Sequence, residues 1–377
     1  MVMLAAGLAA CVSTPRPGAG AAPGAQFEAV AWSRVPGWRV DDLLAAWPAL
    51  VSSCGAMNTR AEWQPFCGAL AAASSTDAEL ARSFLEQHLQ PYRIARHTDG
   101  RRAMTGLVTG YYEPLLHGSR EESERFATPL YRRPDDLLVI DLAAVIPELK
   151  GKRVRGRLEG NKVVPFYSRA QARTAESLRG REIVWIDNPL EAFLLEVQGS
   201  GRVQLPTGET IRLRYDDQNG HPYRSIGRYL ADQGVMPLDA VNMPSIRAWL
   251  EANPARLQEV LDANPSVVFF QEAPLEDAAT GPKGAQGVPL TAGRSIAVDA
   301  TVVPLGAPVF LATTYPVTGL TLQRLVVAQD TGGAIRGPVR ADLFFGFGRE
   351  AGEQAGMMKQ QGEMWLLWPR DAPLPPR

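Results

Sequence analysis

Residues 324–348 constrain the fold of this chain more than any other segment. Two apolar runs in it, 325–328 and 343–347, predict buried strands. Asp330 stands near the end of the first run and Asp342 directly before the second, and two glycines between them permit a sharp turn and close backbone approach. The pattern predicts two carboxylates at the edges of two core strands.

A third carboxylate, Asp299, ends a similar short apolar run at residues 295–298. Carboxylates beside apolar surface have raised pKa values and retain a proton near neutral pH, as general-acid catalysis requires. Aspartate is also a common turn and strand-end residue, so each position alone has an ordinary structural explanation. Three of them in one segment favour a functional site.

The bulk composition is that of a globular protein. At 377 residues, with 45% hydrophobic and 21% charged residues, the chain is long enough for two domains. The 35 glycines and 30 prolines favour many turns and therefore a β-rich architecture. A net charge of -1 argues against a general nucleic-acid binder, and no apolar run is long enough to cross a membrane.

Cys11 closes the sequence Leu-Ala-Ala-Cys after a mostly apolar start, which resembles a bacterial lipoprotein signal at residues 1–11. In such signals the cysteine is lipidated, and Val12 in the next position suggests the outer membrane. The alternative is a chance run of small residues. Residues 12–26 hold almost nothing to bury and predict a flexible linker.

The other two cysteines, Cys54 and Cys67, lie in a segment, residues 27–102, that is predicted to be largely helical. In an exported protein they are expected to form a disulfide, and two buried free thiols are the alternative. A strand is predicted around residues 109–112, where Thr109, Gly110, Tyr111 and Tyr112 offer aromatic faces for sugar rings. A pair of tyrosines within a β-core is the other interpretation.

Several short β-like runs between residues 118 and 265 predict a small β domain inserted into a larger one. One of them, residues 193–198, is expected to be a strand that ends at a Gly-Ser-Gly turn. A buried run at residues 266–271 is expected to return the chain to the main domain.

Several kinds of chemistry find no support in the sequence. The four histidines form no metal-ligand pair, and no phosphate-binding loop is present. The glycines around Ser200 do not make a serine-hydrolase elbow, because Gln198 stands two residues before the serine. Asp330 begins an Asp-Thr-Gly triplet like those of aspartic proteases, but that chemistry needs two such triplets and only one is found. Neither a metal nor a cofactor is expected.

A larger set of short motifs, in this order, resembles the membrane-bound lytic transglycosylase A family. The matching segments are 109–112, 198–201, 219–227, 264–266, 287–291, 330–335 and 340–342. Within this resemblance Asp299, Asp330 and Asp342 correspond to the three aspartates of the three-aspartate domain. The sequence departs from some relatives at Arg340 and Ala341.

The resemblance implies a mainly β fold with peripheral helices. It implies a double-psi β-barrel main domain, with a helical N-terminal part, formed by residues 27–116 and 268–377. A smaller β domain is expected at 117–267, with a glycan groove between the two.

The resemblance also implies a reaction. Family members cleave the bond between N-acetylmuramic acid and N-acetylglucosamine in peptidoglycan and form 1,6-anhydro ends. One carboxylic acid suffices, and the resemblance assigns that role to Asp342. Asp330 would orient it or contact sugar, and Asp299 would support the barrel. Substrate contacts are expected from residues 109–112, Gln198 and Ser200.

The expected partners are peptidoglycan glycan strands and, through the lipid, the outer membrane of a Gram-negative bacterium, facing the periplasm. Proteins of a cell-wall synthesis or recycling complex are further candidates. A different class of function also fits the sequence: a peptidoglycan-binding lipoprotein without catalysis, which would use the same groove and tyrosines.

Overall fold

The computed structural model describes residues 24–73, 77–98, 101–150, 152, 154–275 and 280–375. Cys11 and most of the predicted linker lie outside these residues. Gly24 begins strand β1 (Gly24–Ala29), which pairs antiparallel with β2 (Leu89–Thr98). The last three residues of the predicted linker therefore belong to the fold, because their backbone groups pair with β2.

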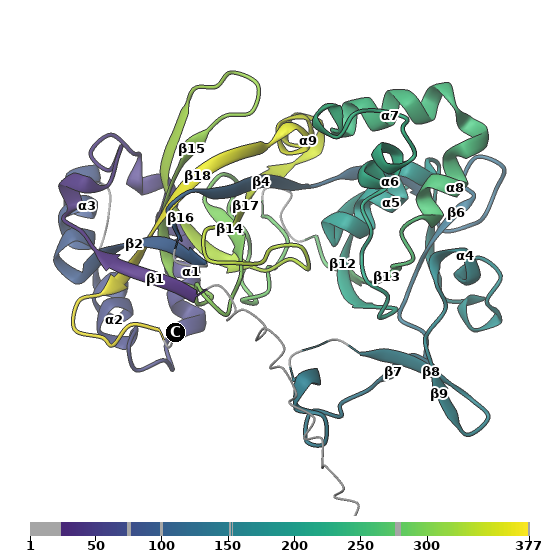
Figure 1. Cartoon of the computed structure of the whole chain (residues 1–377), viewed down its shortest axis with the longest axis horizontal. Coiled ribbons are helices and arrows are strands. Elements are labelled where there is room, and N and C mark those ends of the chain that lie inside the picture. Colours follow the sequence, from purple (N-terminus) through teal and green to yellow (C-terminus); the bar gives the residue numbers. More distant parts are fainter. Residues whose placement is uncertain are drawn as a thin grey trace, which may run out of the picture.

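Six strands close into a barrel. Their order is β18 (Lys359–Pro369), β15 (Pro308–Thr314), β16 (Thr321–Asp330), β14 (Ser295–Val298), β17 (Ala341–Phe347) and β4 (Gly106–Glu113). The barrel closes because β18 pairs with both β15 and β4. The β14–β16 and β17–β4 pairs are parallel, and the other pairs are antiparallel. The expected mainly β fold with a barrel is confirmed (Figure 1).

Strand β16 is apolar on both faces over residues 325–328. Residues 325–328 of β16 are fully buried, since one face lines the barrel and the other packs under helices. Trp63, Phe310 and Trp365 belong to the same core cluster. An uninterrupted apolar run is what a strand covered on both sides requires.

Three helices, α1 (Trp47–Met57), α2 (Gln64–Ala72) and α3 (Ala78–His88), lie together beside the barrel (Figure 1). The prediction that residues 27–102 are largely helical is correct for these three helices and for two short 3-10 helices, Trp32–Arg34 and Leu43–Ala46. β1, β2 and β3 (Arg101–Ala103) surround them in sequence and extend the barrel sheet, because β2 pairs with β18. Residues 89–98 are a strand because they pair with β18, which is distant in sequence.

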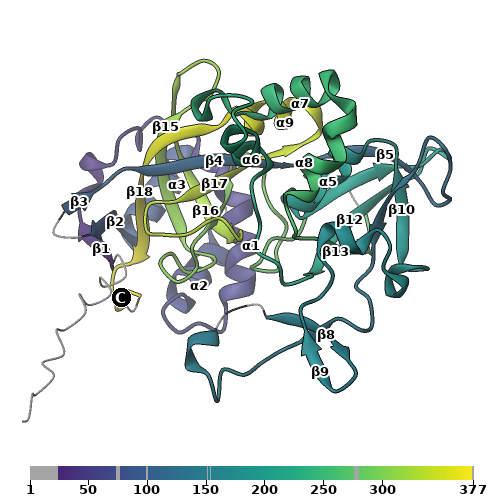
Figure 2. The same ribbon diagram turned by 45° about the vertical axis from the view of Figure 1, so that its right-hand side comes forward.

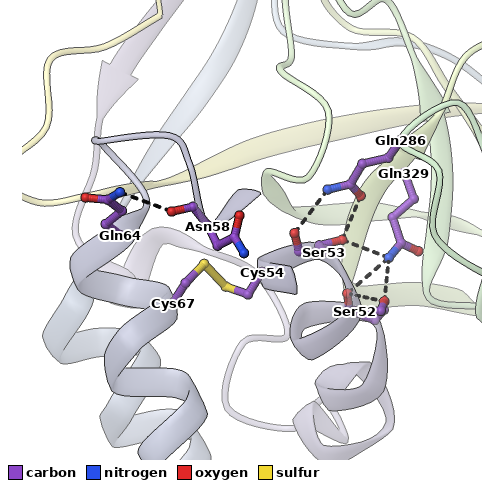
Figure 3. Close-up of a disulfide and its surroundings, with 9 residues drawn as sticks. Ser52, Ser53, Cys54, Asn58, Gln64, Cys67, Gln286 and Gln329 are labelled. Atoms are coloured by element: carbon purple, nitrogen blue, oxygen red, sulfur yellow. Dashed lines mark hydrogen bonds between the residues drawn. A yellow bond between two sulfur atoms is a disulfide. The ribbon is translucent and has the colours of Figure 1, made fainter. Parts of the chain in front are cut away.

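Cys54 of α1 and Cys67 of α2 form a disulfide, with their Cα atoms 5.2 Å apart (Figure 3). Both side chains are buried in the core that these helices share with the barrel. The bond thus fixes two neighbouring helices to each other at the side of the barrel.

A second sheet of six strands lies beyond the end of β4. Its order is β13 (Val268–Ala273), β12 (Thr210–Gln218), β11 (Ser200–Gln204), β5 (Leu115–Ser119), β10 (Glu182–Ile186) and β6 (Thr128–Tyr131). Only Pro114 separates β4 from β5, so the chain passes directly from one sheet to the other (Figure 2).

Strand β13 corrects the prediction that the chain returns to the barrel there. It pairs with β12 at the edge of the second sheet. Phe269 and Phe270, which the apolar pattern marked as buried, pack into two clusters of this region and not into the barrel core. Apolar periodicity predicts burial but does not say in which core.

Residues 193–198, predicted as a strand, form the second half of helix α5 (Pro189–Gln198). The Asn188 side chain accepts hydrogen bonds from the backbone N–H groups of Leu190 and Glu191, with Pro189 at the first helical position. Gly199 ends the helix at φ +81°, a left-handed conformation that glycine adopts without strain. The caps, which lie outside the apolar run, define the helix.

The remaining elements cover the two sheets. The helices are α4 (Arg169–Ala172), α6 (Ile226–Asp232), α7 (Met243–Ala252), α8 (Leu257–Asp262) and, in the barrel part, α9 (Gly348–Met357). Strands β7 (Leu138–Val139), β8 (Arg155–Glu159) and β9 (Lys162–Val164) form a small projecting sheet (Figure 2). Within the described residues, no helix combines the length and the apolar character needed to span a bilayer.

Candidate active site

Four residues lie side by side across four neighbouring strands of the barrel. Ala297 on β14 is the pairing partner of Asp330 on one side and of Asp342 on the other. Asp342 in turn pairs with Thr109 on β4. Neighbouring strands are about 4.8 Å apart, so the two aspartate Cα atoms are separated by roughly 10 Å. Ala297, a buried residue with a small side chain, is the one strand position between the two aspartates.

Asp342 is the predicted acid, and its surroundings suit that role. The Thr109 hydroxyl donates a hydrogen bond of 2.6 Å to Oδ1 of Asp342. Among the described residues no hydrogen bond reaches Oδ2. Burial raises the pKa of Asp342 to about 6, and the negative charge of Asp330 adds to this, while the Thr109 bond and the Arg340 guanidinium oppose it. With this pKa about half of the Asp342 carboxyl groups carry a proton at pH 6, and roughly a tenth still do at pH 7.

Asp330 ends β16 and is held by three hydrogen bonds. Its Oδ1 accepts from the backbone N–H groups of Ala285 and Thr331, both at 2.9 Å. Its Oδ2 accepts from the Tyr111 hydroxyl at 3.0 Å. Burial nevertheless raises the pKa of Asp330 above its ordinary value, against the lowering effect of these three bonds. Asp330 is thus fixed in direction at the site.

Tyr111 donates a hydrogen bond to Asp330 and lies within the field of both aspartates. Its ring packs against Phe344 of β17 at a centroid distance of 5.3 Å, and its hydroxyl reaches across to Asp330. Burial and the charges of Asp330 and Asp342 keep its pKa well above that of free tyrosine, so the phenol stays a hydrogen-bond donor. With its ring packed against Phe344, Tyr111 is less suited to stacking on sugar than its neighbour in sequence.

Tyr112, Gln198 and Gly110 form the junction between the barrel and the second sheet. The Tyr112 backbone N–H donates to Oε1 of Gln198 at 3.1 Å, which ties β4 to the end of α5. The Tyr112 ring is partly exposed and lies against Gly352 of α9. A side chain at Gly110 would collide with Phe345 and α9, so this glycine serves packing.

Ser200 and Asp299 lie apart from this row. Ser200 begins β11, directly after the turn that ends α5. Asp299 follows β14, where its carboxylate accepts bonds from Thr301 N–H, Thr301 Oγ1 and Gly337 N–H. Burial alone would raise the pKa of Asp299, but these bonds hold the pKa below its ordinary value. Asp299 is an anion that joins two loops, as its predicted structural role requires.

Three contributors to the site were missed in the sequence. Ala297 separates the carboxylates, Ala285 binds Asp330, and Arg340 opposes the raised pKa of Asp342. For Ala285 the sequence held an indication, because the family-like segment 287–291 belongs to the same loop. No spacing in the sequence indicates that this loop folds over the end of β16.

A cavity of about 150 Å³ lies elsewhere, between α4, α5 and α8 in the second part of the molecule. It is lined by Tyr131, Arg169 and Phe193, among others, and by none of the predicted site residues. The Arg169 guanidinium is paired there with Glu196. This cavity lies away from the carboxyl groups whose pKa values are raised, and those carboxyl groups identify the barrel site as the candidate for catalysis.

Fold and site together define a β-barrel protein with a carboxylic acid that can release a proton near neutral pH. A family model described as "MltA specific insert domain" matches residues 107–271, and one described as "3D domain" matches residues 294–368. The second match contains all three aspartates.

Known proteins agree with these matches. Membrane-bound lytic murein transglycosylase A of Escherichia coli K12 is 33% identical over 267 residues, which cover 69% of this chain and 64% of that protein. The crystal structure of MltA from Neisseria gonorrhoeae is 35% identical, with a TM-score of 0.80 and coverage of 95% of this chain and 97% of that one. A structure of E. coli MltA with bound chitohexaose is 25% identical, with a TM-score of 0.67 and coverage of 92% and 95%. The chain belongs to the family of membrane-bound lytic murein transglycosylase A.

Proposed function

We propose that this protein cleaves the β-1,4 bond between N-acetylmuramic acid and N-acetylglucosamine in peptidoglycan as a lytic transglycosylase. The observation that carries the proposal is the state of Asp342. Its carboxyl group has one oxygen bound by Thr109, one oxygen without a hydrogen-bond partner among the described residues, and a pKa of about 6. Family membership and the chitohexaose bound to the E. coli relative support a glycan as substrate.

The reaction needs one group that first gives and then takes a proton. Asp342 donates its proton to the glycosidic oxygen, and the bond from that oxygen to C1 of the muramic acid breaks. The C6 hydroxyl of the same sugar then attacks C1, and the carboxylate of Asp342 accepts its proton. The product is a 1,6-anhydro ring, and Asp342 returns to its starting state. The C6 hydroxyl belongs to the same sugar as C1, so its attack gains from proximity and the reaction needs no activated water.

The other groups have supporting roles in this scheme. Asp330 and Tyr111 form a hydrogen-bonded pair whose charge and direction influence Asp342. Tyr112 is the candidate for stacking on a sugar ring. Gln198 at the end of α5 and Ser200 at the start of β11 are candidates for further sugar contacts. Asp330 and Asp342 bond to different hydroxyl groups and share no proton, which argues against aspartic-protease chemistry.

The decisive experiment is incubation of the purified protein with murein sacculi, followed by mass spectrometry of the released material. Release of 1,6-anhydro-muropeptides is expected. Hydrolysed products with free reducing ends would overturn the transglycosylase mechanism. Binding to sacculi without any release would instead favour the lipoprotein that binds peptidoglycan without catalysis.

We also propose lipid attachment at Cys11, with residues 12–23 as a tether that lets the enzyme face the murein layer from the outer membrane. The sequence before the cysteine and the "membrane-bound" name of the relatives support this. Several acyl chains on one cysteine would hold a protein firmly, whereas a single chain holds it only marginally. Cys11→Ser should move the protein to the soluble periplasmic fraction with unchanged specific activity. Retention in the membrane pellet after a high-salt wash would refute the anchor.

A further inference from the structure

A buried network of side-chain amides and hydroxyls lies behind Asp330, on the side away from the site. Gln329 is fully buried, and its Nε2 donates to Ala49 O, Ser52 Oγ and Ser53 Oγ of α1 at 2.8–3.2 Å. Its Oε1 accepts from the Ser295 hydroxyl on β14. Successive residues of a strand point to opposite faces, so Gln329 fixes to α1 the strand end from which Asp330 projects.

A second amide, Gln286, continues this network toward the site. The Ser53 hydroxyl donates to Oε1 of Gln286 at 2.8 Å, and Nε2 of Gln286 donates to Ser53 O at 3.2 Å (Figure 3). The backbone N–H of Gln286 also donates to Gln329 O at 3.0 Å. Gln286 is thereby fixed to the helix by its side chain and to the strand by its backbone.

The residue before Gln286 is the one that touches the site. The Ala285 N–H donates to Oδ1 of Asp330. The loop approaches the strand closely at Gly284, where a side chain would lie 2.4 Å from Gln329 O. The position of the Ala285 N–H therefore depends on where Ser53 and Gln329 hold Gln286.

We propose that Ser53 and Gln286 are positioning residues for the reaction at Asp342. By fixing Ala285 they set the direction of the Asp330 carboxylate and, through its other oxygen, of the Tyr111 hydroxyl. Neither residue touches the reacting atoms. This inference rests on the transglycosylase function proposed above.

The disulfide fastens the helix that carries this network. Cys54 follows Ser53 directly and is bonded to Cys67 of α2, while Ser53 faces Gln286 and Gln329 (Figure 3). A shift of α1 relative to α2 would move Ser53 and with it the loop. The disulfide, which forms in an exported protein, thus helps to fix the geometry around Asp330.

Two variants and one matched control test the proposal in the full-length protein. Gln286→Ala and Ser53→Ala remove the two partners of this contact. Ser52→Ala removes a hydroxyl one residue away that binds Gln329 but has no hydrogen bond to Gln286. The readout is the rate of anhydro-muropeptide release at limiting and saturating sacculi, over a range of pH, with the folded fraction measured by near-UV circular dichroism.

For Gln286→Ala and Ser53→Ala we expect kcat to fall about tenfold, with KM nearly unchanged, because a misplaced group costs rate more than binding. The acid limb of the pH profile, where Asp330 takes up a proton, should move to higher pH. The reason is that Asp330 loses the Ala285 N–H bond, which lowers its pKa. Ser52→Ala should keep both properties.

Two results would overturn the inference. The first is a Gln286→Ala variant with the kcat and pH profile of the wild type. The second is a loss of rate that is equal at every pH and is fully explained by a smaller folded fraction. Gln286 lies in a partly exposed loop, so its variant remains informative if Ser53→Ala does not fold. Absence of anhydro-product from the wild-type protein would refute the proposed function itself, and is thus distinguishable from failure of the positioning role.

Discussion

Asp342 and Asp299 belong to one barrel, and the pKa values of their carboxyl groups are shifted in opposite directions. Asp342 lies within β17, accepts one hydrogen bond from Thr109, and has its pKa raised to about 6 by burial. Asp299 lies after β14, accepts bonds from Thr301 and Gly337, and has its pKa lowered by them against the effect of burial. The first is suited to exchange a proton, and the second to remain charged.

The difference shows that neither burial nor hydrogen bonding alone decides the role of an aspartate. Asp330 accepts as many bonds as Asp299, yet burial among the site residues still raises its pKa. What separates the two carboxylates is the balance between the cost of desolvating the charge, which raises the pKa, and the hydrogen bonds that lower it. Variants that remove the charge of one aspartate or a hydrogen-bond donor to it test the comparison.

The largest effect is expected for Asp342→Asn. The amide oxygen still accepts from Thr109, but the group can neither donate a proton to the glycosidic oxygen nor accept one from the C6 hydroxyl. Release of anhydro-muropeptides from sacculi should fall on the order of a hundredfold or more. The variant should still fold and sediment with sacculi. Activity within about tenfold of the wild type would show that another residue is the acid.

The matched change Asp299→Asn should affect stability and leave the chemistry intact. The amide loses an acceptor and the charge that the surrounding donors favour, which costs about 1–3 kcal/mol of unfolding free energy. Because folding lowers the pKa of Asp299, its contribution is present above about pH 4 and is lost as pH falls through the lowered pKa. Urea unfolding should show a larger difference between variant and wild type at pH 7 than at pH 3. A loss of specific activity in the folded variant would give Asp299 a part in the reaction.

The smallest effect is expected for Thr109→Val, which keeps the shape of the side chain and removes the donor to Asp342. The Thr109 bond lowers the pKa of Asp342, so its loss should raise that pKa further. Activity that requires protonated Asp342 falls as pH rises through this value, and the alkaline limb of the pH profile should move upward. The rate at low pH should change by less than about tenfold. An unmoved alkaline limb would mean that the limb reports a different group.

Much of the site was predictable from local sequence. Apolar runs with aspartates at their ends identified three strands: β16 and β17, which carry Asp330 and Asp342, and β14, which Asp299 follows. The pairing of Cys54 with Cys67 was expected from their proximity in an exported chain, and the structure contains it. These features depend on residues close in the chain, where periodicity and turn chemistry are informative.

Local patterns were wrong where distant partners or end caps decided the conformation. The short apolar run at residues 193–198 predicts a strand, whereas Asn188 and Gly199 outside the run cap a helix there. Strand β13 had the expected burial but packs in the other sheet, since the same apolar side chains suit either core.

The sequence by itself determined which residues are buried, which strands end in carboxylates, and the family to which these motifs belong. Only the tertiary structure decided that Ala297 separates Asp330 from Asp342, and that Thr109 binds Asp342 whereas Tyr111 binds Asp330. It also decided that the loop between β13 and β14 brings the Ala285 N–H to Asp330. The physical reason is that the pKa of a carboxyl group depends on donors, charges and burial within a few ångströms. In this barrel those neighbours come from β4, β14, β17 and a loop, which are distant in sequence and meet only when the barrel closes.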